Sequence, residues 1–329
     1  MTQTYGFEIE SFGLTEQELR TTLTGLRGYN REETTFSGHF GYHGSGTRGH
    51  HNGQENVWAS ERDGSIRNTA GRGLAHEVVS PIIKGQEGLA MLKRAMKALS
   101  RAGAKVNKSC GLHITMGIKN CSARVRRMSA RNLAQRVGRL VDAYDYFYGG
   151  AFCRLVSPSR RVGSPNFNGY APRVSYGYAV PNTYGQGTKT HYTEMMQREV
   201  GRGVVNLGKF LEDGIIEFRQ HNGTLNGEKI VNFALLLHKL VSWAINDEHV
   251  NNGCDIRSFP PTLNGLMDMV NVGSDLRTAL LAREQEIGNT GFQVNTMQEW
   301  SVHNAFMEGN LTAGMNQTVV ETCTTLGGF

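Results

Sequence analysis

The sequence predicts an α+β fold in which an antiparallel β-sheet carries helices on one face and polar side chains on the other. Four short segments alternate apolar and polar residues, as strands with one buried face do. Longer segments between them carry apolar residues at helical spacing. An antiparallel sheet can leave one face uncovered by helices, which suits this combination.

The four predicted strands each place acidic, histidine or arginine residues on a single face. In the segment 5–10, Phe7 and Ile9 share one face while Glu8 and Glu10 share the other, because strand residues two apart lie on one side about 7 Å from each other. The segments AHEVVSP, GLHITMG and IIEFRQH show the same alternation, with Glu77, His113, Glu217 and Arg219 at polar positions.

Helices are predicted at 86–102, from an N-cap at Ser129 through Tyr144, at 228–247, and in a shorter segment capped by Ser274. Residues 34–73 and 158–190 are rich in Gly and polar residues, and we expect long loops there. Residues 251–329 are expected to form a mostly helical or irregular extension.

Composition sets limits on the class of protein. The chain has 329 residues and a formal charge of +6, a mild excess that suits a phosphate-bearing ligand as well as nucleic acid. Its five cysteines are odd in number and contain no C-x-x-C pair, which argues against a disulfide framework and a zinc knuckle. The first residues lack a signal-peptide pattern, and no run of about twenty apolar residues occurs. We therefore expect a soluble, cytoplasmic protein with no membrane partner.

If the four strands are neighbours, their polar faces collect four carboxylates, one imidazole and one guanidinium. Four carboxylates on one surface repel one another unless cations neutralise them. Mg²⁺ takes carboxylate oxygens, and one histidine favours Mn²⁺ as well. The pattern predicts a site for two or three metal ions. The alternative is a solvated face whose charge pairs each contribute less than about 1 kcal/mol.

The same segments carry a resemblance to a known family. Five motifs occur in the order typical of amidoligases. They are YGFEIE at 5–10, Trp58 with Asp63-Gly64-Ser65, HEVVSP at 76–81, SCGLHITMG at 109–117, and VNLGKF with IIEFRQHNGTLNGEKI at 205–230. The resemblance covers residues 5 to about 245. Amidoligases are similar to glutamine synthetases, so it implies a glutamine synthetase-like catalytic domain at 1–250.

The resemblance implies roles for individual residues. The metal ligands would be Glu8, Glu10, Glu77, His113 and Glu217. Arg219 would face the transferred phosphoryl group of ATP and act in catalysis with Glu217, and Asp63 would bind the amine or a metal ion. Relatives often have a second histidine where this chain has Thr115, so any role of that histidine is absent here.

The implied activity is ATP-dependent formation of an amide or isopeptide bond through an acyl phosphate, with Mg²⁺ or Mn²⁺ as cofactor and ADP as product. The carboxylate and amine substrates would come from amino acids, peptides or modified nucleotides. Arg154 and Arg161 are candidates for binding the ATP phosphates, and the 158–190 loop is a candidate cover for the site.

Two other functions remain open at this stage. One is an ATP-dependent phosphotransferase of the same fold that forms no amide. The other is a non-catalytic basic protein that binds nucleic acid or another partner through the arginines of 124–139, which lack interleaved aromatic residues and are not favoured as a nucleic-acid site. The glycine pattern at 44–49 has no preceding apolar strand, so we interpret it as a loop.

Overall fold

The computed structural model describes residues 4–28, 32–42, 55–118, 123–161, 204–207, 210–245 and 255–288. The chain forms two compact units, which are described separately: residues 1–122 with 217–234, and residues 123–216 with 235–329. These units divide the chain at other positions than the predicted boundary at residue 250. A catalytic domain over 1–250 therefore stays a prediction, as does a separate role for 251–329.

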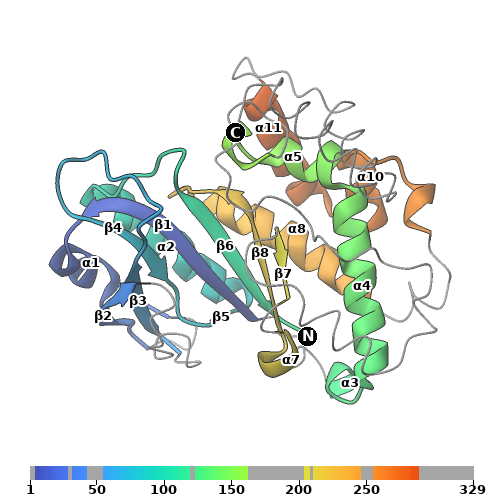
Figure 1. The fold of residues 1–329 in the computed structure, drawn as a ribbon, viewed down its shortest axis with the longest axis horizontal. Helices are drawn as coiled ribbons and strands as arrows, with labels where there is room; N and C mark the ends of the chain where they lie inside the picture. Colours follow the sequence, from blue (N-terminus) through green and yellow to red (C-terminus); the bar gives the residue numbers. More distant parts are fainter. Residues whose placement is uncertain are drawn as a thin grey trace, which may run out of the picture. The chain divides into compact units, whose positions relative to one another are not determined.

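The first unit contains the four strands that the alternation predicts. They are β4 (Leu74–Val79), β1 (Thr4–Leu14), β6 (Gly111–Gly117) and β8 (Ile215–Asn222), and they are neighbours in that order (Figure 1). β1 pairs antiparallel with both β4 and β6. The α+β class and the adjacency of these strands are confirmed.

The sheet is wider than the sequence predicts. Its order within this unit is β2-β3-β4-β1-β6-β8, with β5 (Ile83–Lys84) beside the start of β1. The short strand β7 (Val205–Asn206) belongs to the second unit. β2 (Thr35–Tyr42) and β3 (Val57–Arg62) are parallel to each other, and β3 pairs antiparallel with β4. The predicted 34–73 loop is therefore wrong at these two strands. Their glycine and polar residues hide the alternation, and backbone pairing with β4 selects the strand conformation.

The apolar face of the sheet is buried. Phe7, Ile9, Leu112 and Ile114 are at most 1% exposed. Each such side chain contributes about 1.5–3 kcal/mol when removed from water. The polar side chains of β1 and β6 lie at the alternate positions, so burial of the apolar residues fixes which way the polar ones face.

Two helices of the first unit, α1 (Glu16–Leu23) and α2 (Gly85–Ala102), contact each other, and each also contacts the sheet, α1 through β2 and α2 through β5. α2 begins and ends within one residue of the prediction, and Gly103 ends it in the left-handed conformation. The first turn of α8 (Gly227–Ile245) packs on α2, since a Cβ on Gly227 would lie 2.7 Å from the Cα of Lys93. The Lys93 ammonium also pairs with Glu228 at 2.6 Å.

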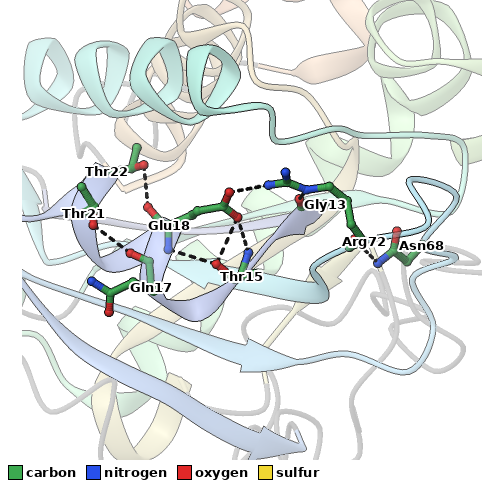
Figure 2. A network of polar contacts seen from close by, with 8 residues as sticks. All are labelled: Gly13, Thr15, Gln17, Glu18, Thr21, Thr22, Asn68 and Arg72. Carbon is green, nitrogen blue, oxygen red and sulfur yellow. Dashed lines mark hydrogen bonds and ion pairs between the residues drawn. The ribbon is translucent and has the colours of Figure 1, made fainter.

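A polar network ties the end of β1 to the chain that precedes β4 (Figure 2). Thr15 caps α1 and exchanges hydrogen bonds with Glu18 in a capping box. Arg72 pairs with the Glu18 carboxylate and donates from Nε to the Gly13 carbonyl at 3.1 Å. Gly73 has φ +66° and lies so close to Gly13 that a Cβ would sit 2.4 Å from its carbonyl carbon. This junction holds β1 and β4 in register.

The second unit is mainly helical in its described residues. Its elements are α3 (Ala123–Arg126), α4 (Ala130–Tyr146), a π-helical turn (Tyr148–Phe152), α5 (Cys153–Leu155), η2 (Pro158–Arg160), α7 (Phe210–Asp213), the end of α8, η3 (Ile256–Ser258), α10 (Leu263–Met269) and α11 (Ser274–Gly288). Ser129 is the N-cap of α4, as predicted, and its Oγ accepts from the Asn132 amide at 3.2 Å. The guanidinium of Arg139 lies 4.0 Å from the Trp243 ring centre, so α4 and the end of α8 pack together.

Among the described helices, none combines the length and the apolar composition that a membrane span requires.

Candidate metal centre

Strand register brings the predicted polar residues together within the first unit. Glu8 of β1 lies opposite His113 of β6, and Glu10 of β1 lies opposite Glu77 of β4. Directly opposed residues project from the same face, with Cβ atoms about 4.5–5.5 Å apart. Pairing on both sides of β1 therefore places these four side chains in one group.

The imidazole of His113 is the centre of this group. Its Nδ1 lies 3.1 Å from Glu8, 3.3 Å from Glu77 and 3.4 Å from Glu217, measured to a carboxylate oxygen in each case. Its Nε2 lies 3.4 Å from an Oε1 of Glu10. All four predicted acidic ligands thus contact the one predicted histidine.

The group is buried, which makes its charges costly. Glu8, Glu10, Glu77 and His113 are each at most 6% exposed. Burial, followed by the Glu8 charge, raises the pKa of Glu77 to about 8. Burial and the Arg219 charge act to lower the pKa of His113, but hydrogen bonds to Glu77 and Glu8 and the Glu77 charge outweigh them and raise it to about 10. The cluster therefore attracts positive charge strongly.

β8 adds the remaining predicted pair. Ile216 and Phe218 are buried, and Glu217 and Arg219 occupy the alternate positions. Arg219 Nη1 donates to Glu217 Oε1 at 2.5 Å. Opposite charge raises the pKa of Arg219 although burial lowers it, so the guanidinium stays charged. Because Glu217 and Arg219 are two residues apart, they lie on the same face of β8. The Glu217 carboxylate therefore reaches His113, and the charged Arg219 guanidinium lies next to it.

One more carboxylate, which the sequence analysis did not predict as a site residue, extends the row of acidic residues that runs across the strands from Glu10 to Glu77. Glu61 of β3 lies directly opposite Glu77 and is 3% exposed. Glu10, Glu77 and Glu61 consequently succeed one another across three adjacent strands. The signal in WASER was weak, because only the large apolar side chain of Trp58 marks the face opposite Glu61, and the segment lay inside the range that we predicted as a loop.

Backbone and loop groups hold the end of this row near Glu10. The Gly111 amide donates to Glu10 Oε2 at 2.6 Å. Asp63 follows β3 and accepts from the Ser65 amide at 2.7 Å. Burial, with contributions from the charges of Glu10 and Asp63, raises the pKa of Cys110 to about 11, which places Asp63 within electrostatic range of the same end. Asp63 is half-buried and does not contact His113 in the contacts described.

The other predicted phosphate-binding residues belong to the second unit. Arg154 of α5 lies 3.7 Å from Glu284 of α11. Arg161 is fully buried and donates from Nε and Nη2 to the Val156 carbonyl at 3.0 and 2.7 Å. Both arginines therefore have contacts within their own unit, and a role in ATP binding stays a prediction. Of the predicted 158–190 cover, residues 162–190 lie outside the described residues, as do 43–54 with the glycine pattern.

The donor set fits a divalent cation. Glu8, Glu77 and His113 each offer a ligand atom, and these atoms lie within 4.8 Å of one another. Carboxylate oxygens with a single imidazole suit Mg²⁺ or Mn²⁺ better than soft ions. Glu10, Glu61 and Glu217 extend the acidic surface beyond the three ligands, so it has the charge to accept more than one ion.

One family model matches the first part of the chain. Residues 1–145 match the family model described as "Putative amidoligase enzyme", a range that includes β1, β3, β4 and β6 and five of the clustered side chains. No curated protein matches the chain.

Proposed function

We propose that this chain, whose residues 1–145 match the amidoligase family model, is an ATP-dependent carboxylate–amine ligase of that family with a glutamine synthetase-like fold. The observation that carries the proposal is the buried group around His113. Its three closely spaced ligands come from β4, β1 and β6, which pair antiparallel, and Arg219 lies next to them.

The acidic residues and His113 are proposed to bind the metal ions of the site. Glu8, Glu77 and His113 would hold one Mg²⁺ or Mn²⁺ ion, with Glu217 beside them at His113 Nδ1. Glu10 and Glu61 would hold a further ion. When bound, the ions neutralise the phosphate charges of ATP and polarise the bond to the transferred phosphoryl group.

The proposed reaction has two steps, phosphoryl transfer and amide formation. An oxygen of the substrate carboxylate attacks the γ-phosphorus of ATP, and ADP leaves with the bridging oxygen. The amine nitrogen then attacks the acyl carbon, loses a proton, and inorganic phosphate leaves. Phosphoryl transfer depends mainly on positioning the reacting groups and on stabilising the charge of the transition state. Bound metal ions and an arginine can therefore catalyse it without a nucleophilic side chain.

Arg219 is proposed to stabilise the charge that develops on the transferred phosphoryl group. Its ion pair with Glu217 fixes the guanidinium beside the metal ligands. Asp63, at the Glu10 end of the row, is proposed to bind the substrate amine or a metal ion. Arg154 and Arg161 remain proposed contacts of the ATP phosphates, and amino acids, peptides and modified nucleotides remain the proposed substrate classes.

The test is metal-dependent ADP release over a panel of amino acids, polyamines, peptides and nucleotides, with mass spectrometry of the products. We expect one carboxylate–amine pair to stimulate ADP release and to yield a product whose mass is the sum of the two substrate masses minus one water. Glu217→Gln should abolish release, whereas Glu87→Gln, an exposed glutamate of α2, should retain it. A stable phosphorylated product without an amide would show a phosphotransferase instead. Equal release by both variants would reject the proposed site.

A further inference from the structure

An arginine-lined cavity lies in the second unit, on residues that the proposed ligase site does not use. It has a volume of about 440 Å³ and is lined by Arg124, Arg127, Met128, Ser129, Asn132 and Arg136. This volume falls in the range of small-molecule binding sites in proteins. Of these six described lining residues, three are arginines, and none is acidic or aromatic.

The fold holds these side chains around the cavity. Val125 is 3% exposed and anchors the short helix α3, and the Arg127 amide donates to the Arg124 carbonyl at 3.0 Å to close a turn. Arg136, one and a half turns into α4, donates from its guanidinium to the Ile245 carbonyl at the end of α8. The arginines therefore come from α3, from the turn that follows it and from α4, and they line one space.

The start of α4 adds to the positive potential. The amides of a first helical turn have no partner inside the helix, and the helix dipole favours negative charge there. α4 has no acidic residue in its first turn, although acidic residues are the usual complement. Ser129 and Asn132 of this turn line the cavity and supply polar groups beside the guanidinium groups.

We propose that this cavity binds a phosphate group of an anionic ligand. Arginine presents planar, paired donors that match phosphate oxygens, and a helix start supplies further donors. Since the described lining contains no aromatic ring, it offers bases no surface to stack on, and we assign recognition to the phosphate rather than to a base. The phosphate could belong to a free small molecule or to the backbone of a nucleic acid.

The experiment measures calorimetric binding of pyrophosphate to the full chain in EDTA, which silences any metal-dependent ATP site. We expect saturable binding that Arg124→Ala and Arg127→Ala each weaken by at least about tenfold, as loss of a charge-assisted hydrogen bond does. Arg126→Ala removes the same charge from the same helix but lies outside the cavity lining. It should weaken binding by less than about threefold. Circular dichroism of each variant checks that it is folded.

The outcomes separate the site from general charge attraction. Equal weakening in all three variants, or no saturable binding, would overturn the proposal. Binding of glutarate as tightly as pyrophosphate would overturn the phosphate assignment. Displacement of pyrophosphate by a single-stranded oligonucleotide without terminal phosphates would support the proposal and identify a backbone phosphate. Failure of the oligonucleotide to displace bound pyrophosphate would support it with a free phosphate ligand. Because no turnover is measured, these results do not depend on the ligase proposal.

Discussion

Replacing Glu77 by Gln is expected to change stability in opposite directions with and without a divalent cation. Burial and the Glu8 charge raise the pKa of Glu77 from 4.5 to about 8. Between these two values the folded protein without metal binds a proton that the unfolded chain has released. The folded state therefore loses stability as the pH rises through this window, and the loss is complete above about pH 8. Gln occupies the same space and needs no proton.

The pKa shift sets the size of the effect. At pH 7 the shift acts over about 2.5 pH units at about 1.36 kcal/mol each, which gives about 3 kcal/mol as an upper value. His113 loses its contact with the Glu77 carboxyl group in Glu77→Gln, and this offsets part of the gain. We expect the free energy of unfolding in EDTA to rise by about 1–2 kcal/mol at pH 7, or about 2–8 °C in Tm. The gain should vanish near pH 4.5.

Addition of Mn²⁺ should reverse the ranking of the two proteins. A cation at a hundred times its Kd stabilises the wild type by about 2.7 kcal/mol, whereas the variant lacks one of three ligands and should gain less than about 1 kcal/mol. Thermal unfolding with EDTA and with Mn²⁺, over pH 4.5–8, measures both effects. Glu87→Gln is the control and should behave like the wild type. Destabilisation of Glu77→Gln in EDTA together with a normal Mn²⁺ shift would refute the reasoning.

Three further outcomes are expected. Arg219→Lys should lower ADP release by about a hundredfold or more and leave the Mn²⁺-dependent Tm shift intact, because lysine keeps the charge but not the paired donors. In chemical denaturation, Gly73→Ala should cost at least about 2 kcal/mol, since its Cβ would clash with Gly13. Gly71→Ala should cost about 1 kcal/mol, because its φ is also positive but nothing lies within 4 Å of its Cβ position. Cys110, with its pKa raised by burial to about 11, should resist iodoacetamide at pH 8 in the native protein and react after denaturation, as read by peptide mass spectrometry.

The sequence was sufficient to locate the strands that carry the cluster. In β1, β6 and β8, strict alternation separates residues such as Ile9 from Glu10, and burial of the apolar set fixes the orientation of the polar set. Helix limits were also predictable where a stop such as Gly103 follows a clear apolar stripe. Local pattern is strong in these segments and agrees with the tertiary structure.

Strand register could not be predicted in the same way. The alternation of β1 does not say that Glu8 faces His113 and Glu10 faces Glu77, because register depends on pairing between distant segments. The same limit explains why Glu61 was missed. β2 and β3 contain too many small and polar residues for local periodicity, and their hydrogen-bond partners supply the missing information.

The most direct test of the metal centre is pulsed electron paramagnetic resonance of Mn²⁺ bound to the wild type and to His113→Gln. A histidine ligand gives the Mn²⁺ signal a nitrogen modulation, which carboxylates and water do not. The account predicts tight Mn²⁺ binding with this modulation in the wild type, and its loss in the variant. Weak Mn²⁺ binding, or a bound ion without nitrogen modulation in the wild type, would contradict the assignment of His113 and its carboxylates as the metal centre.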